Sequence, residues 1–295
     1  SYDCKYRRKV KYMKKVFIVA ETGADIPSKY VSEYGLCIVP MHVSIDGKSL
    51  KDGAFPVSEV FDSYKRTKKL PTTSATNPDE YKEMFEKIHT ENPDAQILHL
   101  CYSAITTATY QNALIASEGL DYVTHIDTKE VTGGQASIVI KMAEYLKNNP
   151  DATMDEVKKE AQYWISKSCC AFFPGDLDYL RAGGRVSNAA YLGATLLGLK
   201  PFIEMIDGKL VCTKKYRGSM SKVCKKMLRE YLAEHNLEPE SIFLIRSEGL
   251  DKEIQRDAEE IAKEMGYTDV KWIDTGCVIS THCGPGAFGV GGFTR

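Results

Sequence analysis

Residues 96–126 have the sequence QILHLCYSAITTATYQNALIASEGLDYVTHI, in which two short apolar runs flank an amphipathic segment. This order is typical of two strands joined by a crossover helix, the unit from which parallel sheets are built. The same alternation extends toward the start of the chain. It predicts an α/β fold with a Rossmann-like parallel sheet, whose strands are Val16 to Ala20, Leu36 to Val43, Gln96 to Tyr102 and Tyr122 to Ile126.

Two helix starts in this half carry the signature of a capping box. Asn77 is followed three residues later by Glu80, and Thr153 is followed three residues later by Glu156. The cap side chain can accept a hydrogen bond from a free amide of the first turn, and the glutamate can accept one from the amide of the cap residue. We therefore expect a helix to begin directly after each cap, the second of them running to about Lys167.

The pattern changes after Lys167 and becomes that of an α+β domain. An apolar CCAFF run predicts a strand, and the turn Asp207-Gly208 between apolar runs predicts an antiparallel hairpin. Amphipathic stretches predict helices from Met220 to about His235 and from Asp251 to Met265. The expected parts of the chain are a disordered basic leader, a parallel α/β domain and an α+β domain, over residues 1–13, 14–168 and 169–295.

Composition argues against several classes of protein. The 295 residues carry a formal net charge of −1, from 39 basic and 40 acidic side chains, which leaves no strong field to attract nucleic acid. The nine cysteines are scattered without a CxxC pair or zinc-ligand spacing, so we expect reduced thiols and no structural metal. No apolar run approaches the roughly 20 residues of a membrane span. We expect a cytoplasmic protein with no nucleic-acid partner and no integral membrane association.

Two short patterns imitate nucleotide-binding loops but lack the required context. Residues 284–289, GPGAFG, match GxGxxG, yet only six residues follow, too few for the helix that would receive a pyrophosphate. Gly47-Lys48-Ser49 resembles the end of a P-loop, but His42 occupies the position of the required glycine. We therefore expect neither a nucleotide nor another cofactor.

Hydroxyl side chains gather beside predicted strands and helix starts. Thr72, Thr73 and Ser74 precede the Asn77 cap, and Ser103 follows a predicted strand and is expected to lead into a helix. Ligands of parallel sheets bind at the carboxyl ends of the strands, and helix N-termini there favour anions. Helix capping alone would also explain these hydroxyl groups, and capping or packing is the expected role of the threonines at 106, 107 and 109.

Two further residues have a pattern that favours ligand contact. Arg185 directly follows Gly183-Gly184, where the absence of side chains lets a backbone approach closely while a charged side chain projects. Its guanidinium could bind a carboxylate or phosphate, although a surface arginine on a turn has the same pattern. His282 lies in a polar, glycine-flanked segment rather than on an apolar helix face, and a structural histidine is the alternative.

Six segments, which together cover nearly the whole chain, carry a resemblance to a known family: ETGADIP from Glu21, PTTSATNP from Pro71, YSAITTATYQNA from Tyr102, LDYLRAGGRVSNAAYLGATLLGLKP from Leu177, IDGKL from Ile206 and THCGPGAFGVG from Thr281. They resemble the DegV family, which is similar to the fatty-acid-binding subunits of bacterial fatty acid kinase. The sequence departs from the family in two places. Glu21, Thr22 and Gly23 stand at the first three positions of the family's DSTADLP, and Ala104 replaces the second serine of its SSGLSGTYQSA.

The resemblance implies a long-chain fatty acid in a tunnel between the two domains. Its carboxylate would accept hydrogen bonds from Thr73 or Ser74 and from Ser103, with Arg185 and His282 near the head group. The family also implies a separate ATP-dependent kinase that converts the presented carboxylate to an acyl phosphate for phospholipid synthesis. The apolar wall of the tunnel would include Tyr191, Leu192, Leu196 and Leu199, and the kinase would dock at Lys214, Lys215 and Arg217.

Two other functions remain open. Ser103 or Cys283 as nucleophile with His282 as base would make the protein a hydrolase or acyltransferase, although no GxSxG motif surrounds Ser103. A lipid-responsive regulatory protein would use the same pocket without a kinase. We expect a carrier and not an enzyme, with a buried tail of ~15 methylenes contributing on the order of 12 kcal/mol before the costs of association.

Overall fold

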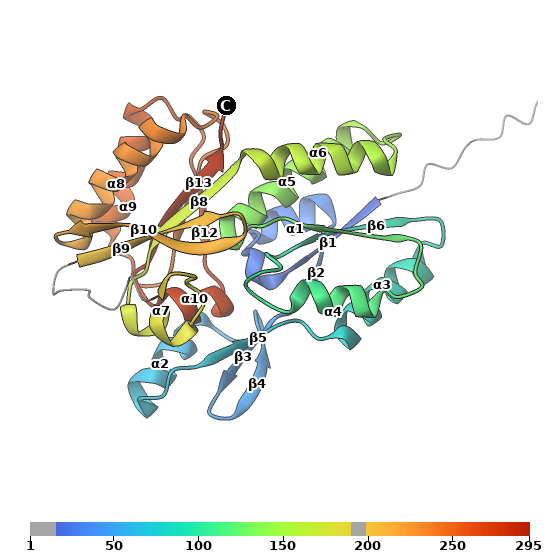
Figure 1. Cartoon of the computed structure of the whole chain (residues 1–295), viewed down its shortest axis with the longest axis horizontal. Helices are drawn as coiled ribbons and strands as arrows, with labels where there is room; N and C mark the ends of the chain where they lie inside the picture. The colour runs from blue at the N-terminus through green and yellow to red at the C-terminus, as the bar shows by residue number, and fades with distance from the viewer. Residues whose placement is uncertain (1–15, 190–198) are drawn as a thin grey trace, which may run out of the picture.

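The computed structural model describes residues 16–189 and 199–295 (Figure 1). The first half contains β1 (Val16–Glu21), η1 (Thr22–Ala24), α1 (Ser28–Tyr34), β2 (Cys37–Val39), β3 (His42–Ile45), β4 (Lys48–Lys51), α2 (Val57–Thr67), β5 (Thr72–Ser74), α3 (Pro78–Glu91), β6 (Gln96–Cys101), α4 (Thr109–Ala116), β7 (Val123–Asp127), α5 (Thr132–Asn148) and α6 (Met154–Lys167). The second half contains β8 (Ser168–Phe173), α7 (Leu177–Gly183), β9 (Leu199–Ile206), β10 (Lys209–Arg217), α8 (Met220–His235), β11 (Phe243–Arg246), α9 (Lys252–Glu264), β12 (Lys271–Asp274), α10 (Cys277–Cys283) and β13 (Phe288–Phe293). Within the described residues, none of the helices is long and apolar enough to span a membrane.

The first part of the chain forms the predicted parallel sheet, in the strand order β2-β1-β6-β7. The predicted strands at β1, β6 and β7 are confirmed. Ile18 and Leu100 on one face pack against α1, α5 and α6, while Val19 and Ile97 on the other face pack against α3 and α4. Figure 1 shows the sheet between these two helical layers. Helices cover both faces because the crossover connections of a parallel sheet run over them.

Both predicted capping boxes are present. The side chain of Asn77 accepts a hydrogen bond from the amide of Glu80 at 3.0 Å, and that of Thr153 accepts one from the amide of Glu156 at 3.3 Å. Each glutamate accepts in return from the amide of its cap residue. The first turns of α3 and α6 therefore have partners for amides that a helix leaves free.

The prediction of one strand over residues 36–43 is wrong. β2 ends at Val39 and pairs with β1, whereas β3 begins at His42 and belongs to a separate antiparallel sheet of order β4-β3-β5. Pro40 stands between them and has no amide hydrogen for the ladder, so the chain leaves the parallel sheet there. Thr72–Ser74, where no strand was predicted, forms β5 in this small sheet.

The second part of the chain forms a mixed sheet of order β10-β9-β8-β13-β11-β12. The CCAFF run lies in β8, and the turn Asp207-Gly208 joins β9 and β10 in the predicted antiparallel hairpin. Both turn residues have positive φ, 48° and 80°, as a two-residue type I′ turn requires. The predicted helices α8 and α9 are confirmed, and they pack on one face of this sheet.

The opposite face of the mixed sheet is turned toward the first part of the chain. Ile203 and Leu210 on this face belong to one apolar cluster with Val43 of β3, Phe61 of α2 and Ile279 of α10. A second cluster joins α5 to β8, β11 and β12. These contacts bring the carboxyl ends of the parallel strands, where ligands bind in such sheets, against the mixed sheet.

Candidate ligand-binding site

A cavity lies where the parallel sheet, the small sheet and the mixed sheet meet. Its volume is about 70 Å³. Most of its lining is apolar and includes Met41, Tyr102, Val131, Phe172, Leu210, Ile245, Val278, Ile279, Ala287 and Phe288. The polar lining includes Thr73, Ser74, Thr106, Thr107, Thr132, Thr275, Arg185 and His282.

Thr73 and His282 form a polar pair in this lining. Oγ1 of Thr73, on β5, lies 2.7 Å from Nε2 of His282, in the last turn of α10. Burial, together with the positive charge of Arg185, lowers the pKa of His282 to about 4, so its imidazole is neutral at pH 7. When the neutral ring donates from Nε2 to Thr73, the threonine hydroxyl remains able to donate to a ligand oxygen.

The backbone at the glycine pair before Arg185 closely approaches another part of the protein, as expected, and the group that it approaches is the imidazole of His282. A Cβ atom on Gly183 would lie 2.3 Å from Nδ1 of His282, so a larger residue would displace the ring. Arg185 is itself exposed and lines the cavity. Its Nη1 donates to the carbonyl of Gly183 at 2.5 Å and its Nε to the carbonyl of Thr106 at 3.4 Å. The guanidinium is thereby held beside the Thr73–His282 pair.

Ser103 is placed differently from the other predicted head-group residues. It is fully buried, and its Oγ donates to the carbonyl of Gly208, in the hairpin turn of the mixed sheet, at 2.6 Å. Among the described residues that line the cavity, Ser103 is absent. The segment after Ser103 leads into a helix as expected, but a loop intervenes, because α4 begins at Thr109.

Thr106 and Thr107 are cavity residues that the sequence interpretation assigned to capping or packing. Both lie in the loop between β6 and α4 and line the cavity. The loop turns back on itself, because Oγ1 of Thr106 donates to the carbonyl of Ser103 at 2.9 Å. Their position in the sequence could have predicted this role. Both threonines follow a strand of the parallel sheet, and ligands of such sheets bind at the carboxyl ends of the strands.

Of the four residues predicted to form the apolar wall, Leu199 alone falls within the described residues. Tyr191, Leu192 and Leu196 lie outside the described residues. Leu199 begins β9 and is not among the described residues that line the cavity. Among the described residues, the apolar lining comes from segments far apart in the chain, including Met41, Phe172 and Val278. No local periodicity marks such a set, because the residues meet only after the sheets have packed.

The predicted docking cations lie on β10, away from the cavity lining. Lys214 and Arg217 are exposed, and Lys215 is half-buried. Together with Lys222 and Lys226 of α8 they border a shallow depression. Nζ of Lys214 lies 3.0 Å from a carboxylate oxygen of Glu234, so part of this positive charge is already paired.

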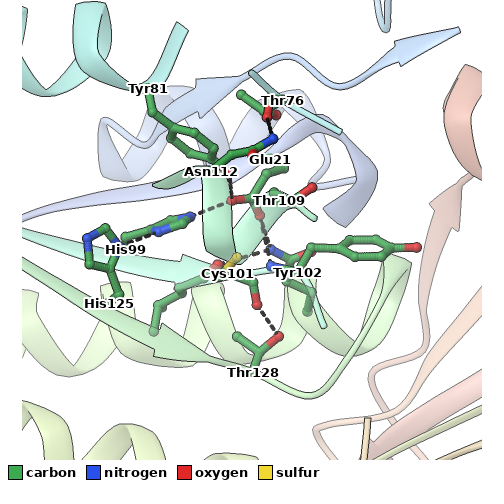
Figure 2. A network of polar contacts seen from close by, with 12 residues as sticks. Glu21, Thr76, Tyr81, His99, Cys101, Tyr102, Thr109, Asn112, His125 and Thr128 are labelled. Carbon is green, nitrogen blue, oxygen red and sulfur yellow. Dashed lines mark hydrogen bonds and ion pairs between the residues drawn. The ribbon is translucent and has the colours of Figure 1, made fainter. Parts of the chain in front are cut away.

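One group of side chains has the composition of a metal site. Glu21, His99 and Cys101 are buried, and each places a potential ligand atom within 4.8 Å of the others. Both oxygens of Glu21 already accept hydrogen bonds, from Tyr81 and His99 on one side and from Tyr102 and Gln135 on the other (Figure 2). A saturated carboxylate has no lone pair to spare for an ion, so we interpret the group as a hydrogen-bond network.

Comparison with known proteins places the chain in a family. The model of the DegV family matches residues 15–295. A DegV domain-containing protein of Caldanaerobacter subterraneus is 31% identical over 94% of this chain and 98% of its own length. A fatty acid-binding protein of Thermotoga maritima is 29% identical over 94% of this chain and 97% of its own length.

A solved structure gives the same result for the fold. The structure is that of a fatty acid-binding DegV family protein from Streptococcus agalactiae. It superposes with a TM-score of 0.82 at 25% identity, over 96% of this chain and 99% of that one. The match includes both the parallel sheet and the mixed sheet, since it extends over nearly the whole length of each chain. On this evidence the chain belongs to the DegV family.

Proposed function

We propose that this protein binds a long-chain fatty acid in the cavity between the sheets and acts as its carrier. The observation that supports this proposal is the composition of the cavity: an apolar lining with one hydroxyl–imidazole pair, Thr73–His282, and one guanidinium, Arg185. The relatives from Thermotoga maritima and Streptococcus agalactiae are described as fatty acid-binding proteins.

The carboxylate is assigned to the polar side of the cavity. Thr73 donates its hydroxyl hydrogen to one carboxylate oxygen, and Arg185 supplies the compensating positive charge. Ser74, on the same strand, offers a second hydroxyl. A charge-assisted hydrogen bond of this kind contributes about 1.5–3 kcal/mol, which mainly sets the orientation of the head group. His282 holds the Thr73 hydroxyl in place as a neutral ring.

The tail is assigned to the apolar side of the cavity, where Met41, Phe172, Leu210 and Val278 form part of the lining. Each buried methylene contributes about 0.8 kcal/mol, so a tail of ~15 methylenes contributes on the order of 12 kcal/mol before the costs of association and ordering. Met41 can adapt to the shape of the tail, because its unbranched side chain has three rotatable bonds.

The arrangement favours a carrier over a hydrolase or acyltransferase. The hydroxyl of Ser103 donates to a backbone carbonyl, and the partner of His282 is Thr73 instead of a serine or cysteine. Burial raises the pKa of Cys283 to about 12, so its thiol is protonated at neutral pH and is a poor nucleophile.

A partner kinase is the second part of the proposal. The cations at Lys214, Lys215 and Arg217 would contact an acidic surface of an ATP-dependent fatty acid kinase, which would phosphorylate the presented carboxylate. Acyl phosphate formation on mixing the protein with such a kinase and ATP tests this step. The double variant Lys215→Glu/Arg217→Glu is expected to slow it, and Lys263→Glu, an exposed lysine of α9, serves as the control.

The direct test of the carrier function is identification of the bound ligand. The purified protein is denatured, extracted with organic solvent and analysed by mass spectrometry. We expect a fatty acid in approximately equimolar amount. Absence of a fatty acid, combined with no uptake of added palmitate or oleate in a calorimetric titration, would overturn the proposal.

A further inference from the structure

One face of helix α10 forms part of the wall of the ligand cavity. Val278, Ile279 and His282 all line the cavity. Val278 and Ile279 lie four and three positions before His282, a spacing that places the three side chains on the same face of a helix. The ring of His282 contacts Thr73 at the end of the helix. The position of the whole helix therefore sets both an apolar and a polar part of the lining.

Two buried acids from the first half of the chain hold the start of α10. The amide of Gly276, directly before the helix, donates to Oδ1 of Asp25 at 2.8 Å. The amide of Cys277, the first residue of the helix, donates to Oδ1 of Asp52 at 2.9 Å. A helix leaves the amides at its start without partners of its own, and here the two acids supply them. Asp25 and Asp52 are only 9% and 6% exposed, so both hydrogen bonds are shielded from water.

The two acids lie so close to the backbone of α10 that the helix has little room to shift toward them. A Cβ atom on Gly276 would lie 3.0 Å from Oδ1 of Asp25 and 3.2 Å from Oδ1 of Asp52, closer than most real Cβ contacts. Burial raises the pKa of both acids, and hydrogen bonds, including those from the amides of α10, act in the opposite direction. The acids and the start of the helix therefore stabilise one another.

Each acid is in turn fixed to another part of the structure. The amide of Asp25 donates to the carbonyl of Thr22 at 3.0 Å, and Oδ2 of Asp25 accepts from Oγ1 of Thr132 at 2.6 Å. Thr132 begins α5 and lines the cavity. The amide of Asp52 donates to the carbonyl of Met41 at 2.9 Å, and Met41 lines the cavity as well. Asp25 and Asp52 therefore connect the start of α10 to two other walls of the same cavity.

We propose that Asp25 and Asp52 are positioning residues for ligand binding. Among the described residues that line the cavity, neither acid is present, so both act through α10. They hold the start of the helix against the first half of the chain, and the helix in turn holds the ring of His282 against the hydroxyl of Thr73. Loss of either acid frees the start of the helix and weakens the hold on the carboxylate. This inference rests on the proposed function, in which Thr73 donates to that carboxylate.

The test is a double-mutant cycle between Asp52→Ala and Thr73→Val, with palmitate affinity measured by calorimetric titration. Asp52→Ala alone should weaken binding by roughly tenfold, because the amide of Cys277 loses its partner and the helix can shift. In the Thr73→Val background the same substitution should change the affinity by less than about two-fold, since the hydroxyl that His282 holds is already absent. Asp52→Asn keeps an oxygen that can accept from the amide of Cys277 and should restore most of the affinity.

Asp251→Ala is the matched control for the loss of an acid at the start of a helix. Oδ1 of Asp251 accepts from the amide of Glu253 in the first turn of α9, at 2.8 Å. Helix α9 packs on the face of the mixed sheet that is turned away from the cavity. The substitution should lower the free energy of unfolding in urea and leave the palmitate affinity unchanged.

Three outcomes would overturn the inference and leave the proposed function intact: wild-type affinity in Asp52→Ala, an equal loss in both backgrounds, or an Asp52→Asn variant that binds no better than Asp52→Ala. A wild type that binds no palmitate would overturn both. If Asp52→Ala does not fold, Gly276→Ala replaces it in the cycle, because the added methyl group pushes α10 away from both acids without removing them. The same dependence on Thr73 is then expected, and an equal loss in both backgrounds would again contradict it.

Discussion

Nε2 of His282 lies 2.7 Å from Oγ1 of Thr73, a residue 209 positions earlier in the chain. This contact joins α10, which lies between β12 and β13 of the mixed sheet in the chain, to β5 of the small sheet, and it does so in the wall of the cavity. If the neutral imidazole donates from Nε2, the threonine hydroxyl is left free to donate to a ligand in the cavity, as we propose.

Thr73→Val removes the hydroxyl and keeps the shape of the side chain. We expect the affinity for palmitate to fall by roughly 10- to 100-fold, because one charge-assisted hydrogen bond to the carboxylate is lost. Thr73→Ser retains the donor and should bind within a few-fold of the wild type. Isothermal titration calorimetry measures both variants. Equal affinity of Thr73→Val and the wild type would show that the carboxylate lies elsewhere.

Ser103→Ala should affect stability more than ligand affinity. The substitution removes the hydrogen bond from Oγ to the carbonyl of Gly208 and leaves a carbonyl in the hairpin turn without that partner. We expect the free energy of unfolding to fall by about 1–3 kcal/mol in urea denaturation. Ser74→Ala, at an exposed position, should change it by less than about 0.5 kcal/mol. A normal unfolding curve for Ser103→Ala combined with lost palmitate binding would assign Ser103 to the head group.

Arg185→Gln should discriminate between charged and neutral lipids. The guanidinium is exposed, so its attraction for a carboxylate is screened and we expect only a two- to five-fold loss of palmitate affinity. Binding of hexadecanol, which has no charge, should be unchanged. Arg181→Gln, in the preceding helix α7, is the control for the general loss of a positive charge. An equal loss for palmitate and hexadecanol would assign a packing role to Arg185.

Glu130→Gln should alter the dependence of stability on pH. Burial raises the pKa of Glu130 from 4.5 to about 8, so the folded protein holds a proton that the unfolded chain releases. The stabilisation is complete below pH 4.5 and is lost as the pH rises through about 8, with a slope of at most about 1.4 kcal/mol per pH unit.

The measurement for Glu130 is urea unfolding at several pH values from 5 to 9. The Gln variant, which remains neutral, should lose less stability over this interval than the wild type. Glu118→Gln, at an exposed position, should keep the wild-type slope. Identical slopes for the wild type and Glu130→Gln would show that Glu130 is ionised throughout.

Local patterns predicted a large part of the fold. The apolar runs at β1, β6 and β7, the caps at Asn77 and Thr153 and the turn at Asp207-Gly208 were all visible in short stretches of sequence. Such features depend on neighbouring residues, so a few positions suffice to recognise them. The strand over residues 36–43 failed because its apolar run continues across Pro40 into a different sheet. The apolar character of a residue alone does not predict which sheet its strand will join.

The candidate site was predictable only in part. Thr73, Arg185 and His282 were named from motifs, and all three line the cavity. Ser103 was also named as a head-group residue from a motif. Its hydroxyl instead donates a hydrogen bond to the carbonyl of Gly208, 105 positions later in the chain. Its neighbours Thr106 and Thr107 reach the cavity because the loop turns back after Ser103. Hydroxyl groups in the same loop therefore have different roles, and the hydrogen-bond partner that the tertiary structure supplies to each one decides which role it has.

The order of residues along this chain specifies strands, caps and turns, because each depends on hydrogen bonds and side-chain periods within a few positions. Packing specifies the apolar lining and the links between Glu21, His99 and His125, because their members come from separate strands and helices. A lone histidine or glutamate has no distinctive local signature. Its chemistry arises when burial removes water and leaves another side chain as its partner.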